Sequence, residues 1–295
     1  MGIAETHSDV GINRREINRK GGVDLGQNPW GPYDPIMTVV AFRTLDNKPI
    51  ANLIHYSAHG TAAGCNREIS RDWSGVMTDR LEKESGAVTA FFNGAEGDVG
   101  PRLSNGSTVG DIAHVRELGG VAAMDAVRGY KKIKSYRVPS LGFVQGEIKL
   151  PYSPLMPKEE ALEALEKYEN PEELINISYL EYHRLKSILA VYENNEPIKT
   201  HNIFEQTMIK LDDVVFIPIA YEFFVEIALR LRKFSPYQYT LSLSNANGSN
   251  SYLATQSEIC KGGYEIRSFL SGNTYNLTPD ADTLIVNEHL RLLNQ

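Results

Sequence analysis

The residues best suited to chemistry lie in one stretch of the chain, from His55 to Arg102. His59 follows the apolar run 50–58 and is followed by Gly-Thr, so a loop at the end of a strand exposes its imidazole. Asp98 lies in a glycine-rich loop that follows the apolar run 88–92. Because α/β enzymes place their reactive groups in loops at strand ends, both side chains are candidates for catalysis or metal binding.

Each candidate residue also has an ordinary structural explanation. A histidine at a strand end commonly makes hydrogen bonds without binding a metal. Asp72 and Asp98 are equally suited to capping turns. Glu222 follows an apolar run and opens a helix, where a carboxylate interacts favourably with the helix dipole. Tyr252 and Tyr264 flank a short amphipathic segment, and they fit half-buried packing positions with hydrated hydroxyl groups.

The elements that must position these residues alternate between strands and helices. Hydrophobic periodicity predicts strands at 36–42, 50–56, 88–92, 141–150, 204–211, 214–219 and 239–243, and helices at 74–85, 111–130, 158–168, 178–193, 223–233 and 284–293. Short polar turns at 46–47 and 212–213 predict two hairpins. The predicted fold class is mixed α/β (α+β), a mixed sheet with hairpins flanked by helices.

Several local features refine this prediction. Gly86 is expected to end the helix at 74–85, and Gly119-Gly120 within the helix at 111–130 is expected to allow close packing against a neighbour. Thr278 and Pro279 are the predicted N-cap and first residue of the last helix. The charged helical pair at about 155–195 is interpreted as an insertion in a single domain that spans 1–295.

Composition excludes several classes of protein. The chain has 295 residues, of which 42% are hydrophobic, enough for a sizeable core. Its net charge of -7 and scattered basic residues argue against a broad nucleic-acid-binding surface, and the basic run 13–20 is interpreted as a solvated face or a helix C-terminus. Cys65 and Cys260 lack metal-type spacing and are expected to be buried or half-buried thiols.

The sequence contains no signal peptide and no apolar run long enough to cross a bilayer. A soluble protein is therefore expected, cytoplasmic by default or secreted if the true N-terminus lies upstream.

A set of short motifs follows the order and spacing of one known family. The motifs are Gly11-Ile-Asn-Arg14, Asn28-Pro-x-Gly-Pro, Ala58-His59-Gly-Thr, Ile69-Ser70-x-Asp72-x-x-Gly75, Gly97-Asp98-Val-x-Pro101, Glu222 before Glu226-Ile-Ala-Leu-Arg, Ala246-Asn-Gly, Tyr252-Leu-x-Thr and Gly263-Tyr264-Glu265. Over nearly all its residues, the chain resembles the catalytic N-terminal domain of the neutral/alkaline (non-lysosomal) ceramidase family.

The resemblance implies a zinc-dependent amidase of sphingolipid metabolism, which cleaves the N-acyl bond of ceramide to give sphingosine and a fatty acid. Carried over to this chain, it implies zinc ligation by His59, Glu222 and Tyr252, while Arg14 and Tyr264 contact the scissile amide. Zinc accepts nitrogen and oxygen ligands and lowers the pKa of a bound water to about 7. Asp72 and Asp98 are expected to orient His59 or to order the loops around it.

The chain departs from the family pattern in two places. The family's other zinc histidine lies in a Thr-His-Thr-His-Ser-Gly-type motif well before the Ile-Asn-Arg segment, and His7 is too close to Arg14 to replace it. We therefore expect an N-terminally incomplete catalytic domain, which also lacks the family's immunoglobulin-like domain. Gly100 occupies the position of a family serine, so direct attack by metal-activated water and a different amide or ester substrate are expected.

Two other interpretations remain open. The chain could be a catalytically inactive remnant, or a subunit that needs a separate N-terminal half as its partner. It could also be a non-catalytic module for a lipid ligand, with the segment 155–192 as a surface element.

Overall fold

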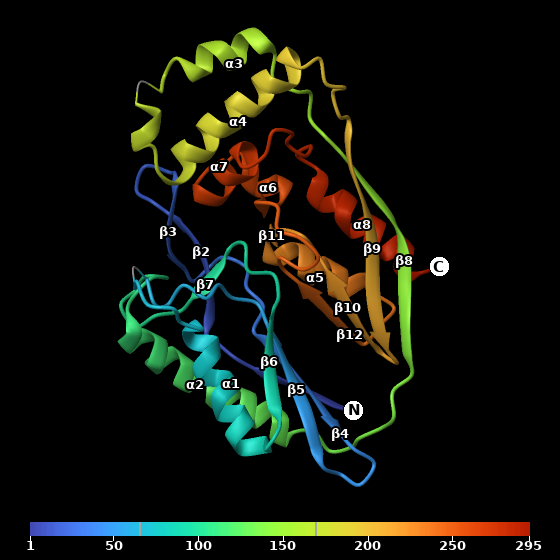
Figure 1. Ribbon diagram of the computed structural model, residues 1–295. Helices are drawn as coiled ribbons and strands as arrows, with labels where there is room; N and C mark the ends of the chain where they lie inside the picture. The colour runs from blue at the N-terminus through green and yellow to red at the C-terminus, as the bar shows by residue number, and fades with distance from the viewer. Residues whose placement is uncertain (65, 169) are drawn as a thin grey trace.

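Two four-stranded sheets, each with helices packed against it, form the body of the molecule (Figure 1). The computed structural model describes residues 1–64, 66–168 and 170–295. The first sheet has the order β1-β4-β5-β6, built from β1 (Gly2–His7), β4 (Ile36–Arg43), β5 (Pro49–Tyr56) and β6 (Val88–Asn93). The second has the order β12-β10-β9-β8, built from β8 (Leu141–Pro151), β9 (His201–Leu211), β10 (Val214–Pro218) and β12 (Tyr239–Leu243).

Two smaller sheets carry residues of the candidate site. One has the order β3-β2-β7, from β2 (Gly11–Ile17), β3 (Val23–Asn28) and β7 (Val99–Pro101). The other pairs β11 (Glu222–Phe223) with β13 (Tyr252–Leu253) in parallel.

The helices form three groups along the chain. The bounds are α1 (Asp72–Ser85), α2 (Ile112–Lys131), α3 (Lys158–Leu165), a 3₁₀ turn (Pro171–Glu173), α4 (Asn176–Glu193), α5 (Val225–Phe234), α6 (Gln256–Ile259), α7 (Tyr264–Ser271) and α8 (Ala281–Leu293). Helices α1 and α2 pack on the first sheet, and α5 and α8 pack on the second (Figure 1). Helices α3 and α4 pack on each other, and α4 contacts α7.

Local sequence explains why these elements begin and end where they do. The antiparallel pair β4–β5 is closed by a turn in which Asn47 has a positive φ of 66°, a conformation that asparagine tolerates. Gly86 ends α1 in the left-handed conformation, with a φ of 70°. A Cβ on Gly119 would lie 2.6 Å from the Cβ of Val76, so the expected close packing is confirmed there, while Gly120 has open space around it.

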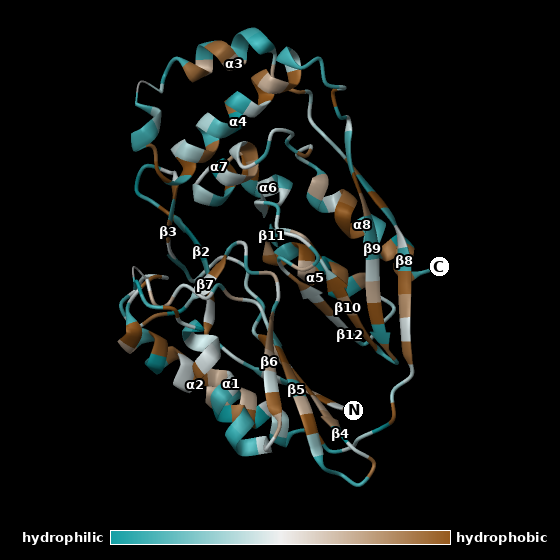
Figure 2. Ribbon diagram, viewed as in Figure 1, coloured by the Kyte–Doolittle hydropathy of each residue, from teal (hydrophilic) through white to brown (hydrophobic). Residues whose placement is uncertain are grey.

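The main hydrophobic core joins the two large sheets and their helices. Fully buried side chains come from both halves of the chain, for example Trp73, Ile148 and Phe223. In Figure 2, β4 is mostly hydrophobic, whereas α3 and α4 alternate hydrophilic and hydrophobic residues, with a small cluster of their own between them. None of the helices in the described ranges is both long and apolar enough to cross a membrane.

The predicted mixed α/β class is confirmed, as are both predicted hairpins, with the strands divided among four sheets in the described part of the chain. The eleven-residue antiparallel ladder between β8 and β9, which brackets the helical pair, was not predicted. The first three strands of the chain, β1 to β3, were not predicted either.

Two local predictions were wrong and one was only partly right. In the basic run 13–20, Arg14 and Arg15 are buried in strand β2, whereas Arg19 and Lys20 are exposed as a solvated face requires. The last helix begins at Ala281 with Asp280 as its N-cap, so Thr278 and Pro279 lie in the preceding turn. Cys260 is exposed rather than buried, and Cys65 lies outside the described residues.

Candidate active site

Backbone groups hold His59 in place after the end of β5. The His59 N–H donates to the carbonyl of Val99 at 3.0 Å, and the indole N–H of Trp73 donates to the His59 carbonyl at 2.9 Å. The imidazole is nearly buried, and its Nδ1 lies 2.6 Å from the carbonyl oxygen of Glu96. Because a carbonyl only accepts, Nδ1 carries the proton and Nε2 is left for the site.

The parallel pair β11–β13 brings Glu222 and Tyr252 to this imidazole. The two residues are direct partners in the ladder. Glu222 Oε2 lies 2.9 Å from His59 Nε2, and the Tyr252 hydroxyl lies 3.3 Å from the same nitrogen. The Asp98 loop approaches β11 closely at Gly97, where a Cβ would lie 2.6 Å from the Glu222 carbonyl oxygen, so a larger residue does not fit.

Strand β2 adds a buried arginine to the cluster. Arg14 Nη2 donates to the Tyr252 hydroxyl at 2.9 Å, and Arg14 Nε donates to Glu265 at 2.7 Å. Tyr264 lies at the edge of the site, 42% exposed, with its ring centroid 5.9 Å from that of Tyr252. The structure thus brings together the five residues predicted to bind zinc or the scissile amide, and their chemical roles remain predictions.

Asp72 and Asp98 lie nearby without touching the imidazole. The Asp72 carboxylate accepts from the backbone N–H groups of Ala62 and Ala63, in the loop that follows His59. Asp98 accepts from the Val225 N–H at 2.7 Å and from Asn13 Nδ2 at 3.2 Å, so it connects strand β2 to the start of α5. Both carboxylates thus accept from backbone N–H groups near the site, and the role expected of them from the sequence stays a prediction.

Two further glutamates belong to the site and were not singled out from the sequence. Glu265 is fully buried and accepts from both Arg14 and Arg15, at 2.7 and 2.8 Å. Glu96 holds the His59 Nδ1 proton through its backbone, while burial raises the pKa of its side chain. The position of Glu265 directly after Tyr264 was the available signal, because that pair ends the last of the recognised motifs.

The charges of the site favour an ionised Glu222 beside a neutral Tyr252. Burial acts to raise the pKa of Glu222. A proton on His59 Nε2, the Tyr252 hydroxyl and the Arg14 guanidinium stabilise the carboxylate and lower this pKa to about 2. Burial, together with the nearby Glu222 carboxylate, raises the pKa of Tyr252 well above its ordinary value. The pKa of Arg14 is raised as well, since Tyr252 and Glu265 more than offset its burial.

The donor atoms suit a zinc ion in kind, and they are one fewer than the ligand set implied by the sequence resemblance. With the proton on Nδ1, the lone pair of His59 Nε2 faces a carboxylate oxygen 2.9 Å away, so a cation is needed between them, either a proton or a metal ion. The nitrogen, carboxylate and phenol are all zinc ligand types, and a catalytic zinc site usually has three protein ligands with a water in the fourth position. In the described ranges no group of three or more His, Cys, Asp and Glu side chains could hold a metal ion.

Comparisons with known proteins bear on the fold. No family model matches the chain, and no curated protein does. Among solved structures, neutral ceramidase from Pseudomonas aeruginosa matches 99% of this chain with a TM-score of 0.68 and 18% identity. A ceramidase complexed with C2 matches 99% of the chain with a TM-score of 0.64 and 16% identity. The fold is ceramidase-like.

This match confirms the predicted resemblance at the level of the fold. The chain spans about half the length of these ceramidases, 51% of the first and 52% of the second. Within this fold, Arg14, His59, Glu222, Tyr252 and Tyr264 lie close together although they come from four separate regions of the sequence.

Proposed function

We propose that this chain carries the larger part of the active site of a zinc-dependent hydrolase of N-acyl amide bonds, related in chemistry to ceramidase. The observation that carries the proposal is that Glu222 Oε2 and the Tyr252 hydroxyl lie 2.9 and 3.3 Å from His59 Nε2, next to the buried Arg14. A ceramidase-like fold supports the substrate class, and ceramide or another N-acyl amide is the proposed substrate.

The residues have distinct proposed roles. His59, Glu222 and Tyr252 would hold the zinc ion, which polarises a carbonyl group and supplies a nucleophilic water at neutral pH. Arg14 lies against Tyr252 and stabilises negative charge that develops on the amide oxygen. Glu265 keeps the Arg14 guanidinium oriented, and Tyr264, at the exposed edge, contacts the entering substrate.

A second candidate function follows from the number of ligands. Three donors, one of them a neutral phenol, bind zinc weakly, because the phenol must lose its proton to bind well. A fourth ligand from a separate polypeptide would complete the site. In that case this chain is a subunit, inactive until its partner binds.

Zinc content and hydrolysis test the two candidates. For the purified wild type, about one zinc per chain by elemental mass spectrometry is expected. His59→Ala should lose the metal and the hydrolysis of a fluorogenic N-acyl substrate, while His7→Ala, which changes an exposed histidine, should keep both. A folded wild type with little zinc and no turnover contradicts an active site complete in this chain, and it favours the subunit.

A further inference from the structure

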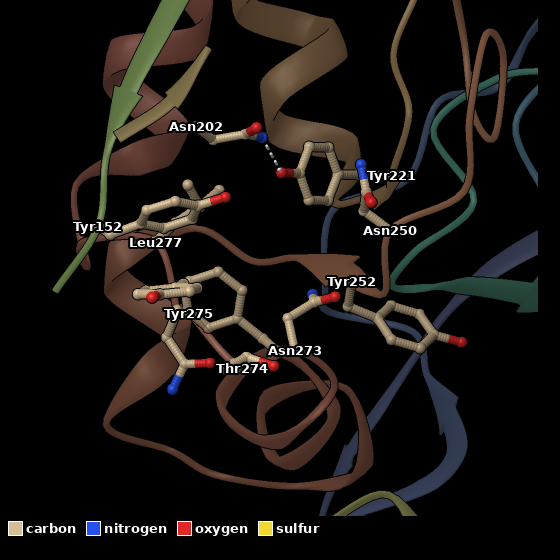
Figure 3. Close-up of a pocket in the computed structure, with 11 residues that line it drawn as sticks. Tyr152, Asn202, Tyr221, Asn250, Tyr252, Asn273, Thr274, Tyr275 and Leu277 are labelled. Atoms are coloured by element: carbon tan, nitrogen blue, oxygen red, sulfur yellow. Dashed lines mark hydrogen bonds between the residues drawn. The ribbon is translucent and has the colours of Figure 1, made fainter. Parts of the chain in front are cut away.

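A polar pocket lies beside the candidate active site and shares one wall with it. Its volume is about 220 Å³, and eleven residues line it, including four tyrosines and four asparagines. Tyr252 is the shared residue. Figure 3 shows its hydroxyl pointing away from the pocket, toward the side on which it meets His59. A molecule in this pocket would therefore lie directly behind a residue of the proposed zinc site.

The lining carries no formal charge. None of the eleven residues is Asp, Glu, Lys, Arg or His. Burial raises the pKa of Tyr152 and raises that of Tyr221 to about 12, so both phenols are neutral. Two cations border the wall without lining the pocket. Arg184 donates to the Asn273 carbonyl at 3.0 Å, and the Lys199 ammonium lies 5.9 Å from the Tyr275 ring centroid. Such a lining favours an uncharged ligand.

The polar groups of the wall are incompletely paired. Asn202 Nδ2 donates to the Tyr221 hydroxyl at 3.0 Å, and Figure 3 shows the hydroxyls of Tyr152 and Tyr221 pointing toward each other. Asn276 Nδ2 donates to the Leu270 carbonyl, but its Oδ1 is buried without a partner among the described residues. That oxygen has almost no accessible surface, so a ligand would pair with the accessible hydroxyls and amides of the wall, because a ligand hydroxyl both donates and accepts.

The wall also presents aromatic faces. The rings of Tyr152 and Tyr275 stack with centroids 5.2 Å apart and an interplanar angle of 30°. Phe269 and Leu277 complete the apolar part. Apolar faces beside a few fixed polar groups are typical of small-molecule sites.

We propose that this pocket binds a neutral, hydroxyl-rich group of about the size of one sugar ring. The volume corresponds to about seven waters at roughly 30 Å³ each, which a monosaccharide ring would replace. The amides and phenols pair with its hydroxyls, and the aromatic faces pack against its carbon-bound hydrogens. Combined with the proposed hydrolase function, such a pocket points to a substrate class, an N-acyl lipid with a glycosyl or similar polyhydroxyl head group. This substrate class rests on the proposed function.

Saturation-transfer NMR on the full chain tests the binding directly, with methyl β-glucopyranoside as the probe and glucose 6-phosphate as its charged counterpart. We expect saturable binding of the neutral sugar and weaker binding of the phosphate. Tyr152→Phe should weaken binding of the neutral sugar about threefold to tenfold, because one neutral hydrogen bond is lost. Asn202→Trp, whose much larger side chain occupies part of the pocket, should abolish it.

Tyr179→Phe is the matched control, because Tyr179 is an exposed tyrosine of α4 that does not line the pocket. It should leave the affinity unchanged. The proposal is overturned by absence of saturable binding, by stronger binding of the phosphate, or by equal affinities in the wild type and both pocket variants. This readout needs neither zinc nor turnover, so a failed hydrolase assay would leave it unaffected.

Discussion

At the residue scale, the candidate site is a set of paired buried charges built around one imidazole. Arg14 and Arg15 face Glu265, and Arg14 also faces the Tyr252 hydroxyl next to Glu222. Arg15 also pairs with Glu258, so the two guanidinium groups lie among three carboxylates, and this pairing makes their burial tolerable. His59 Nε2 and the neutral Tyr252 hydroxyl are the other two groups that could coordinate a metal ion. Nε2 faces the ionised Glu222, and the hydroxyl faces Nε2. A cation placed there meets ligands already held by backbone and side-chain contacts.

Packing around residue 100 explains why a glycine occupies this position. A Cβ on Gly100 would lie 2.7 Å from the Cβ of Thr108, so the threonine occupies the space that a serine side chain would need. Gly100→Ser should therefore lower the free energy of unfolding by about 1–3 kcal/mol, as overpacking usually does. Urea unfolding measures this.

Gly100→Ser combined with Thr108→Gly, which removes both the Cβ and the Cγ2 of the threonine, should recover most of that loss. Gly120→Ser is the control, because Gly120 has open space around its Cβ position, and it should cost nothing. Equal losses for the single and double variants would show that Thr108 is not the obstacle.

At the element scale, helix α8 is attached to the second sheet by a buried histidine. The fully buried His289 donates from Nδ1 to the Ile285 carbonyl at 2.7 Å, and its Nε2 accepts from Gln206 Nε2 of strand β9 at 2.9 Å. Protonation of Nε2 would place an N–H donor of His289 opposite the N–H donor of Gln206. Burial accordingly lowers the pKa of His289 to about 4.

This histidine makes stability depend on pH. Between pH 6.5 and about 4 the unfolded chain binds a proton on His289 that the folded chain does not, so its contribution is complete above pH 6.5 and is lost as the pH falls. The loss should be on the order of 3 kcal/mol. Urea unfolding of the wild type and His289→Leu at pH 4.5 and 7.5 measures it, with a smaller pH effect expected in the variant.

The comparison with the variant is needed because Asp98 acts in the opposite direction. Burial raises the pKa of Asp98 to about 7, so its contribution to stability falls as the pH rises through the same range. The difference between wild type and His289→Leu cancels this effect. An identical pH effect in both proteins would rule out His289 as its source.

Elements of ordinary length and period were predictable from the sequence, and short or polar ones were not. The hairpins and most helix ends follow from alternation, polar turns and a C-terminal glycine such as Gly86. The strand β2 contains Arg14 and Arg15, which are buried only because Glu265, about 250 positions later, pairs with them. The two-residue strands β11 and β13 carry no periodic signal at all. The candidate site was therefore predicted from motifs of a known family, since periodicity alone would have missed it.

At the scale of the whole molecule, the site joins regions that are distant in sequence. Arg14 lies 238 positions from Tyr252, and His59 lies 163 positions from Glu222. The unfolded chain does not hold these groups together, so a metal that binds all of them binds the folded state alone. Such a ligand must stabilise the fold as a whole.

Metal removal should therefore lower the stability of the protein. At a free zinc concentration one hundred times the dissociation constant, the free energy of unfolding should rise by about 2.7 kcal/mol over the chelated protein. Thermal or urea unfolding with EDTA, and again after zinc is restored, measures the difference.

Glu222→Gln should abolish most of this stabilisation by zinc, because the ionised carboxylate is the strongest ligand of the set. His201→Ala is the control. This histidine lies on strand β9, contacts its neighbour Thr200 and is not one of the proposed ligands, so the variant should keep the full effect. If zinc stabilised Glu222→Gln as much as the wild type, the metal would bind elsewhere. If it stabilised neither, the three donors would not form a zinc site without a fourth ligand, and the subunit interpretation would gain support.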